Sequence, residues 1–322
     1  MLKIERYKVS NANQWDKFVL SSNNGTIFHL KQFLNYHPEE RFIDHSLVIT
    51  KREKIFSVFP AAEKNLDGEK TLVSHPGSSV GSFAVPVNLS LANALALVKK
   101  LKAYSREQKF RRIIITLPPY PYQNRPSDYM EYAFFSQGFR YKKREVTSIL
   151  FLDKSIDRIL DNFHTSHKRS IRKASEIGIK IRQSDDLETF YKILQNNLKT
   201  RHGVKPTHTL DELKKIKAEF PKEVTLFGAY YNDMMVAGVI NFHINNKALL
   251  AFYISHDENY SDLRSVNLLF YFIFSWAINN GYNTYDFGIF TIDGEPNMGL
   301  GRFKENFGAS GIFRNTIEIR LQ

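Results

Sequence analysis

The alternation of hydrophobic and polar positions is clearest in the second half of the chain. Hydrophobic residues recur at helical spacing over 187–203 and 207–221, and Thr209 and Pro221 mark the start and the end of the second helix. Three strand-like runs follow, and then an apolar helix, a strand, a short helix and a last strand. These later segments are 224–232, 235–244, 247–255, 265–281, 284–290, 300–307 and 313–321.

The first half repeats this order of elements more faintly. Its segments are a helix at 11–25, a hairpin at 46–64, a strand at 70–77, a helix at 91–108, a strand at 111–119, a helix at 129–139 and a strand at 145–152. Helices that alternate with meandering strands predict an α/β (α+β) protein with a mixed sheet, and the repeated order indicates duplication. We therefore expect a first domain over residues 1–153 and a second over 154–322.

A basic segment, SHKRSIRKASEIGIKIRQ, lies near the start of the second half. At helical spacing, Lys168, Arg169, Arg172 and Lys173 share one face. One interpretation is an ordinary solvated face of a connecting helix. The other is an electropositive wall that binds a phosphate-bearing substrate or an RNA backbone. The pattern alone leaves both open.

Composition and charge narrow the function classes. The chain has 322 residues, a formal net charge of +12 and no cysteine. The missing cysteine excludes a disulfide scaffold, a thiolate metal site and a cysteine nucleophile. The positive charge favours anionic partners such as nucleic acid, nucleotide-linked substrates or an acidic membrane surface. The first residues show no signal peptide, and the apolar run 266–278 is too short to span a bilayer, so we expect a cytoplasmic protein.

Three isolated motifs fail on their context. Asp286-Phe287-Gly288 lacks the other signatures of a protein kinase. The GSSVG sequence at 77–81 lacks the helix that follows a nucleophilic serine in hydrolases. The histidines do not occur at metal-ligand spacing, and we expect His164 and His167 to be structural or surface residues and no metal to be bound.

Three stretches taken together resemble the Fem-type (FemABX) aminoacyltransferases, a family built from two GNAT-like acyltransferase domains. They are HKRSIRKASEIGIKI, LKTRHGVKP, and YDFG followed by GLGRFKENFGA. The last block is fairly specific, because glycines and phenylalanines are placed at set distances from one lysine. The resemblance implies two tandem GNAT-like domains. It also implies transfer of an aminoacyl group from aminoacyl-tRNA to an amine of a peptidoglycan or polysaccharide intermediate in cell wall biogenesis.

The same resemblance implies roles for individual residues. The lysine of the family's Phe-Lys pair assists catalysis, and the matching pair here is Phe303 and Lys304. A second-domain arginine binds substrate phosphates, and Arg201 is the best match. Lys31, in FHLKQFLNYHP, is the candidate for the first-domain lysine, although its local spacing departs from the family pattern. The coiled-coil arm with which some members bind tRNA has no counterpart in the sequence.

The chemistry of acyl transfer suggests further site residues. Lys304 would stabilise the developing oxyanion, and its alternative is a solvated surface lysine. Asp286 would orient the loop that follows it or assist proton transfer; equally, it would be structural. Gly299 and Gly301 would let the chain approach a ligand closely.

Four more residues are candidates for substrate binding. Lys168 and Arg172 come from the basic helix. Arg201 is alternatively a helix-end residue that interacts with the helix dipole. Tyr253 lies on the strand that would face the acyl donor, and alternation in that strand leaves both of its faces open.

Two rival functions remain. An acyl-CoA-dependent N-acyltransferase that acts on an amino sugar or nucleotide sugar would need a glycine-rich pyrophosphate loop, and no glycine occurs from Ser255 to Asn280. A non-catalytic nucleic-acid-binding module would show an RNA-recognition signature, and none is visible. We expect no cofactor beyond the acyl donor. The expected partners are a phosphate-bearing envelope precursor, tRNA and the surface of a membrane.

Overall fold

The chain folds into two compact units in this computed structural model, which describes residues 2–153, 155–202 and 204–321. Unit one comprises Met1–Val146, Ile292–Gly294 and Phe313–Gln322, and unit two comprises Thr147–Thr291 and Glu295–Ile312. Each unit has its own hydrophobic core. The short strands β14 (Thr291–Ile292) and β15 (Glu295–Pro296) pair with each other.

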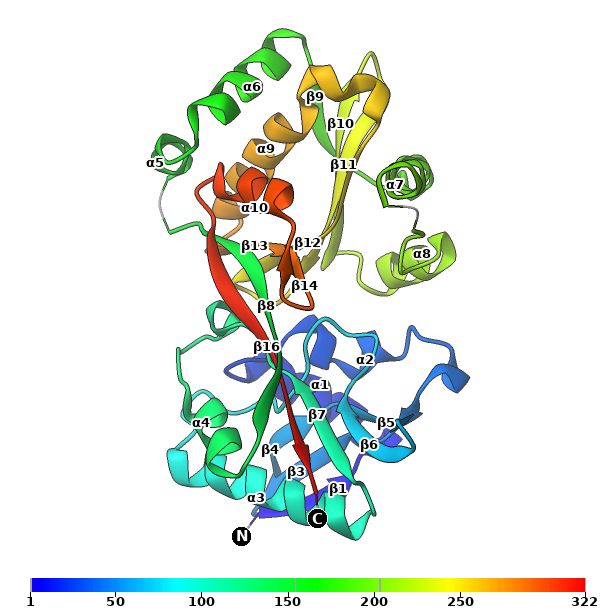
Figure 1. The fold of residues 1–322 in the computed structure, drawn as a ribbon, viewed down its shortest axis with the longest axis vertical. Helices are drawn as coiled ribbons and strands as arrows, with labels where there is room; N and C mark the ends of the chain where they lie inside the picture. The colour runs from blue at the N-terminus through cyan, green and yellow to red at the C-terminus, as the bar shows by residue number, and fades with distance from the viewer. Residues whose placement is uncertain (1, 154, 203, 322) are drawn as a thin grey trace. The chain divides into compact units, whose positions relative to one another are not determined.

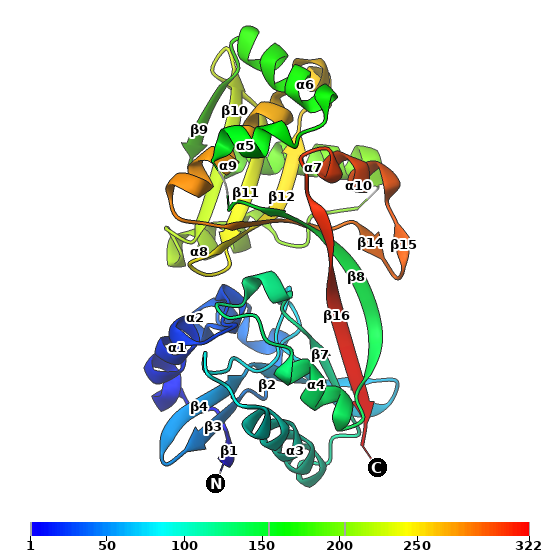
Figure 2. The same ribbon diagram turned by 90° about the vertical axis from the view of Figure 1, so that its left-hand side faces the viewer.

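Unit one contains two sheets, one long helix (Leu91–Glu107) and several shorter helices. One sheet has the strand order β1-β3-β4, and the other includes β2-β5-β6-β7-β16. Helices α3 and α4 lie together in Figure 2, and both contribute to the core around Phe59, Phe83 and Phe134. The elements are β1 (Leu2–Arg6), α1 (Ala12–Ser21), α2 (Lys31–Leu34), β2 (Ile43–Asp44), β3 (Leu47–Lys51), β4 (Lys54–Phe59), β5 (Ala61–Leu66), β6 (Glu69–Ser74), α3 (Leu91–Glu107), β7 (Arg112–Thr116), α4 (Tyr129–Ser136) and β8 (Arg140–Phe151).

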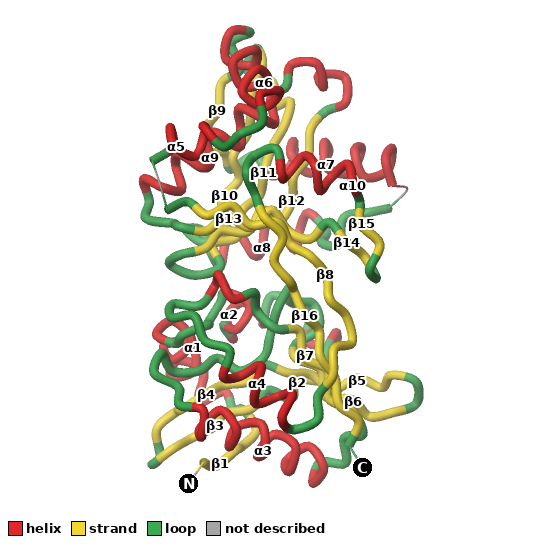
Figure 3. The backbone as a smooth tube through the Cα atoms, turned by 60° about the vertical axis from the view of Figure 1, so that its left-hand side comes forward, coloured by secondary structure: helices red, strands yellow, loops and turns green. Residues whose placement is uncertain are grey.

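Unit two is a layered α/β unit. Its strand order is β8-β13-β12-β11-β10-β9, with an antiparallel meander β10-β11-β12 and a parallel β12–β13 pair. Helices α7 and α8 cover one face of the meander, and α6 and α9 cover the other (Figures 1 and 3). The elements are α5 (Ile156–Asp161), α6 (Thr165–Glu176), β9 (Lys180–Ser184), α7 (Leu187–His202), α8 (Leu210–Glu219), β10 (Val224–Tyr231), β11 (Met234–His243), β12 (Ala248–His256), α9 (Ser265–Asn279), β13 (Thr284–Ile289), α10 (Met298–Glu305) and β16 (Ser310–Arg320).

Local sequence signals explain the helices of unit two. The predicted N-cap Thr209 accepts a hydrogen bond from the Glu212 N–H, and the Glu212 side chain accepts one from the Thr209 N–H, which is a complete capping box. Helix α9 is apolar because it is buried between the sheet and α6. No helix in the described part of the chain is long and apolar enough to cross a membrane.

The boundaries between the two units differ from the expected boundary at residue 153. The chain passes from unit one to unit two within β8, after Val146. The C-terminal strand, expected in a continuous second domain, returns to unit one, where Thr316 to Arg320 pair with Thr116 to Arg112 of β7. A strand needs a free edge to pair with, and β7 provides it.

Candidate active site

The centre of unit two contains a fork between two parallel strands. Strands β12 and β13 pair only from Ala248↔Thr284 to Leu250↔Asp286. Beyond this point the two strands no longer pair with each other, although both continue. We define the fork as residues Ala251–Ile254 of β12 together with residues Phe287–Ile289 of β13.

A bulge on the outer side of each strand explains the fork. Strand β12 slips by one residue against β11, so that Ala251 pairs with Asn241 while Tyr253 pairs with Ile240. Strand β13 slips against β8 between Asp286 and Ile289. A bulge bends its strand and increases the local twist. Two bulges at the same level, on opposite outer edges, therefore favour separation of β12 from β13.

Unit one has an equivalent parallel pair, but its own chain fills the space beyond. Strands β6 and β7 pair from Thr71↔Arg112 to Val73↔Ile114. Past this point, the Thr116 N–H donates to Ser74 Oγ at 2.9 Å and the Gly81 N–H donates to the Thr116 carbonyl at 2.8 Å. The loop around Gly81 thus takes the place that a ligand would need between these strands. This difference makes unit two the better candidate for catalysis.

Asp286 fixes the backbone of the fork. Its side chain is fully buried, and Oδ1 accepts hydrogen bonds from the Thr147 hydroxyl and, at 2.7 Å, from the Gly288 N–H. Gly288 has φ +79°, a conformation that residues with a side chain rarely adopt. The contacts correspond to the loop-orienting role among the three roles predicted for Asp286.

Lys304 is buried in α10 and is not a solvated surface residue. Its exposed fraction is 1%, and its ammonium donates to the carbonyl oxygens of Gly288 at 2.7 Å and Ile289 at 3.0 Å. The nitrogen also lies 5.8 Å from the centre of the Phe290 ring. A positive charge is therefore held at the β13 side of the fork. Lys304, Asp286 and the fork backbone form one connected group, which we call the Lys304 cluster.

The neighbours of Lys304 on α10 are packing residues. Phe303 and Phe307 belong to the core around α9, as their spacing predicts, and the His167 ring packs against both. His167 Nε2 lies 3.2 Å from the Phe303 carbonyl, and burial lowers the pKa of this histidine. His167 is thus structural, and it connects α6 to α10. Phe303 carries no polar side-chain group, so its predicted catalytic part would lie in its backbone.

The two glycines of α10 differ in what surrounds them. A β-carbon at Gly301 would lie 3.0 Å from the Phe290 ring, so a side chain there would force that ring to shift by a few tenths of an ångström. Gly299 is exposed, and the nearest atom to such a carbon would be Asn297 Oδ1 at 3.6 Å. Only Gly299 leaves open space of the kind predicted for close approach to a ligand.

Tyr253 lies on the opposite face of unit two from the core around α9. Ala251 belongs to that core, and the bulge at Phe252 turns Tyr253 to the face covered by α7 and α8. There its hydroxyl oxygen accepts a hydrogen bond of 3.1 Å from the His208 N–H and lies 3.0 Å from His208 Nδ1. Burial raises the pKa of the Tyr253 phenol.

The predicted basic residues are not gathered at the Lys304 cluster. On α6, Lys168 is bonded to the Asp161 carbonyl at 2.9 Å, and Arg172 pairs with Glu176 at 3.0 Å on an exposed surface. His167 and Ala174 are the buried residues of this helix. The Arg201 side chain lies outside the described residues. The arrangement of α6 matches a solvated face with local ion pairs.

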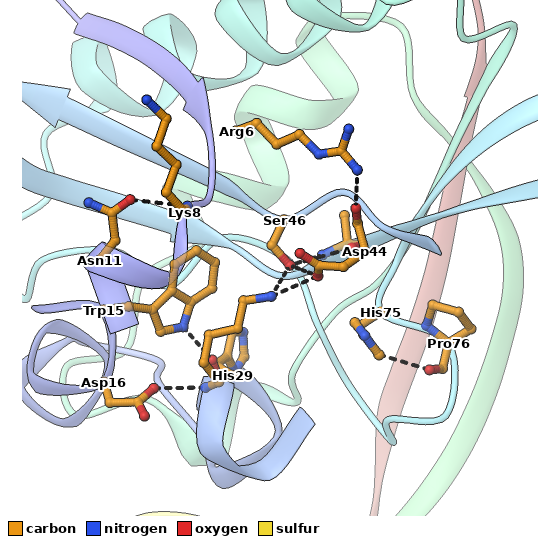
Figure 4. A network of polar contacts seen from close by, with 12 residues as sticks. Arg6, Lys8, Asn11, Trp15, Asp16, His29, Asp44, Ser46, His75 and Pro76 are labelled. Carbon is orange, nitrogen blue, oxygen red and sulfur yellow. Dashed lines mark hydrogen bonds and ion pairs between the residues drawn. The ribbon is translucent and has the colours of Figure 1, made fainter. Parts of the chain in front are cut away.

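Lys31 is enclosed within unit one. It is 3% exposed, and its ammonium donates to Asp44 Oδ1 and Ser46 Oγ, both at 2.7 Å, and lies 4.3 Å from the centre of the Tyr7 ring. Figure 4 shows Asp44 and Ser46 side by side in this network. Burial lowers the pKa of Lys31. Burial alone would raise the pKa of Asp44, but Lys31, Ser46 and His75 together outweigh it and hold that pKa below its usual value. These contacts hold the Lys31 ammonium in the interior of unit one.

The segment between β12 and α9 is acidic and lacks a glycine-rich turn. It forms a 3₁₀ helix over Glu258–Leu263, and Arg264 takes the left-handed conformation, with φ +57°, just before α9. Its carboxylates, from Asp257, Glu258 and Asp262, disfavour a pyrophosphate at this helix start. No group of three or more acidic or histidine residues that could hold a metal ion occurs in the described part of the chain.

Several residues of this region were missed by sequence reasoning. Gly288 and Thr147 position Asp286, Phe290 packs on Gly301, and His208 contacts Tyr253. Gly288 lies in the quoted YDFG motif, so its role had a signal. The other three lie in no motif and come together only through the fold.

Comparison with known proteins identifies the domain type. Residues 161–305 match the family model described as "Acetyltransferase (GNAT) domain", and this range contains α6 to α10 and the Lys304 cluster. No curated protein matches the chain. The match confirms the prediction of an acyltransferase.

Solved structures resemble the chain over nearly its whole length. The crystal structure of FemX covers 99% of this chain and 97% of its own, with a TM-score of 0.77 and 15% identity. L-PGS from Bacillus licheniformis covers 96% and 91%, with a TM-score of 0.61 and 11% identity. A tandem GNAT protein from the clavulanic acid biosynthesis pathway covers 100% and 99%, with a TM-score of 0.57 and 10% identity. They confirm the predicted fold of two GNAT-like domains.

Proposed function

From a Fem-type, GNAT-like acyltransferase fold, we propose that the chain transfers an aminoacyl group from aminoacyl-tRNA to an amine of a cell-envelope precursor. A peptidoglycan or polysaccharide intermediate is the proposed acceptor. The observation that carries the proposal is the buried ammonium of Lys304, held at the fork by the carbonyls of Gly288 and Ile289.

The position of Lys304 suits the transition state of acyl transfer. Attack of an amine on an ester carbonyl places negative charge on the carbonyl oxygen, and a prearranged cation lowers the energy of that charge. Lys304 is already desolvated and oriented, so little reorganisation is needed when the charge develops. Asp286 contributes indirectly, because it fixes the N–H of the glycine whose carbonyl holds the ammonium.

Charge supports a polyanionic donor. The net charge of +12 favours tRNA and phosphate-bearing precursors over neutral substrates. Similarity to FemX and to L-PGS fits this class of reaction. With charged tRNA as donor, the proposed reaction takes place in the cytoplasm. An envelope precursor as acceptor brings the protein to the surface of the membrane.

The competing donor is acyl-CoA, with an amino sugar or nucleotide sugar as acceptor. The match to an acetyltransferase (GNAT) domain supports this donor. Binding of the CoA pyrophosphate would need a glycine-rich turn at the start of a helix. The acidic segment Asp257–Asp262 and the absence of glycine there oppose it. We expect no tight binding of acetyl-CoA.

Donor discrimination tests the proposal. Purified protein is offered a mixture of charged tRNAs or acetyl-CoA, each with a panel of amine acceptors: nucleotide-linked peptide precursors, amino sugars and aminolipids. We expect transfer from charged tRNA only, and loss of that transfer in Lys304→Met. Transfer from acetyl-CoA alone, or micromolar affinity for it by isothermal titration, would decide for the competing donor.

A further inference from the structure

Tyr253 and His208 form a polar pair for which the acyl-transfer site described above has no use. Tyr253 is half-buried, and His208 is 6% exposed in the connection between α7 and α8. The Tyr253 oxygen lies 3.1 Å from the His208 backbone nitrogen and 3.0 Å from its ring Nδ1. Two contacts from one residue fix the phenol at the β12 side of the fork.

The contacts define the direction in which the phenol donates. The Tyr253 oxygen accepts from the His208 N–H and is also hydrogen-bonded by Thr207. A phenol has a single hydrogen to give, and Nδ1 of a neutral imidazole is an acceptor when the ring hydrogen is on Nε2. We therefore assign the tautomer with hydrogen on Nε2, in which Tyr253 donates to Nδ1.

One other titratable group, Tyr191, acts on this pair, and Glu212 acts on Tyr191. On α7, the Tyr191 hydroxyl donates to the His208 carbonyl at 3.0 Å. On α8, Glu212 lies near Tyr191 and raises its pKa further, after burial. Both burial and Tyr191 raise the pKa of Tyr253, while Thr207 and His208 act against them. The phenol is therefore protonated near neutral pH.

Acyl transfer to an amine requires a proton to move twice. The attacking amine must lose a proton as the new C–N bond forms, and the departing oxygen must gain one as the C–O bond breaks. Lys304 would stabilise the negative charge on the carbonyl oxygen, but an ammonium group accepts no proton. The carboxylate of Asp286 is fully buried and accepts from Thr147 and Gly288, so the contacts of the Lys304 cluster assign no group to either proton transfer.

We propose that Tyr253 and His208 form a proton relay for acyl transfer, with Tyr253 at the amine and His208 acting through it. In the first step the amine takes the place of Thr207 at the Tyr253 oxygen, and its proton passes to that oxygen while the phenol hydrogen passes to His208 Nδ1. In the second step His208 returns a proton to Tyr253, which gives one to the departing 3′-oxygen of the donor. No proton is gained or lost overall. The relay rests on the proposed function.

The position of Tyr253 agrees with these separate roles, in which Lys304 supplies the cation and Tyr253 transfers the proton. Lys304 holds its charge on the β13 side of the fork, and Tyr253 lies on β12, three residues beyond the last paired residue, Leu250. Because β12 and β13 separate between them, a carbonyl group placed in the fork would have the cation on one side and the phenol on the other.

The test compares pH profiles of single-turnover transfer from charged tRNA. In the parent protein, the rate should fall as the pH drops and His208 gains a proton. His208→Asn keeps a polar group but cannot titrate. We expect its rate to fall to about one hundredth of the parent's or lower, and the low-pH limb to disappear. Tyr253→Phe should lower the rate similarly, and the double variant should be no slower than either single variant. Tyr191→Phe removes the contact to the His208 carbonyl and one influence on the Tyr253 pKa, but it removes neither relay group, so it should keep the parent's low-pH limb.

The outcomes separate the relay from the reaction itself. If the parent transfers and His208→Asn keeps both rate and profile, the relay is wrong. His208→Gln and the thermal midpoints of all variants exclude loss of folding as the cause of a slow rate. A further readout needs no activity: nitrogen NMR of the His208 ring should show hydrogen on Nε2 and an accepting Nδ1 that changes in Tyr253→Phe, and an unchanged Nδ1 signal contradicts the pair. If the parent transfers from no donor, the proposed function fails and the relay with it.

Discussion

The ammonium of Lys304 donates a hydrogen bond of 2.7 Å to the backbone carbonyl of Gly288. The N–H of the same glycine donates to the carboxylate of Asp286 at 2.7 Å. Two side chains that lie 18 residues apart in the sequence are thus connected through one peptide segment. A change at either is expected to reach the other through the position of Gly288.

Replacement of Lys304 should affect both rate and stability. Lys304→Met removes a fixed cation, and loss of one oxyanion-stabilising group slows enzymes about a hundred- to a thousand-fold. It also removes a donor from the carbonyls of Gly288, which is partly buried, and Ile289, which is exposed, so we expect a cost at the lower end of about 1–3 kcal/mol. The measurements are the single-turnover rate and the thermal midpoint. A parallel change at Arg302, an exposed basic residue of the same helix, should alter neither. An unchanged rate in Lys304→Met would remove Lys304 from the mechanism.

Two substitutions of Asp286 distinguish orientation from proton transfer. In Asp286→Asn the remaining carbonyl oxygen can still accept from Thr147 and Gly288, so we expect folding and most of the rate to survive. Asp286→Ala leaves the Gly288 N–H without this acceptor and should destabilise by about 1–3 kcal/mol and slow transfer. Steady-state rates and urea unfolding check both. A stable Asp286→Asn that has lost its activity would instead support proton transfer by this carboxyl group.

The glycines of α10 form a matched pair. Gly299→Ala adds a methyl group at ordinary contact distance from Asn297 Oδ1 and should stabilise the helix by up to about 1 kcal/mol. Gly301→Ala places its methyl 3.0 Å from the Phe290 ring and should lower the thermal midpoint. If a ligand approaches the chain at Gly299, Gly299→Ala will bind substrate more weakly although it is more stable. Equal KM values for Gly299→Ala and the parent would exclude that approach.

Stability should fall between pH 6.5 and 4 because of buried histidines. Burial lowers the pKa of His29 to about 4, while its ring bridges Thr26 Oγ1 and the Gly81 carbonyl. An unfolded chain takes up this proton near pH 6.5, so acid favours unfolding over the whole interval. The pKa values of His75 and His243 are lowered to about 4 in the same way.

His29→Gln tests this pH dependence. The variant lacks one of the three titrating groups, so its free energy of unfolding should depend less steeply on pH than that of the parent. Urea titrations at several pH values between 4 and 7 measure the slope. A slope identical to that of the parent would show that His29 does not titrate in this interval.

The basic face of α6 can be tested by salt dependence. If Lys168 and Arg172 contact tRNA phosphates, replacing both with Ser should weaken tRNA binding and reduce the slope of log affinity against log salt by about one to two units. Folding should hardly change, because exposed ion pairs contribute little. Filter binding over a range of salt concentrations measures this slope. Unaltered affinity and slope would leave α6 as a solvated face.

The sequence by itself determined the order of the main elements from α7 to β16 and the residues of the key motif, whereas β1, α5 and β9 were not predicted. Periodicity placed α7 to α10, since buried helices and strands must repeat apolar residues at 3.6 or 2.0 positions. The capping signal at Thr209 was local, and so it was readable. The Phe-Lys pair was found because it follows the YDFG motif closely in the sequence, within one short stretch.

Only the tertiary structure decided on which side of the fork each group lies. The face of Tyr253 depends on one slipped residue, Phe252, and alternation within a strand does not show a bulge that is set by pairing with β11. The burial of Lys304 depends on carbonyls that β13 turns toward α10. The C-terminal strand pairs with β7 because an open edge was available about two hundred residues earlier in the chain. These are long-range contacts, and a local pattern carries no record of them.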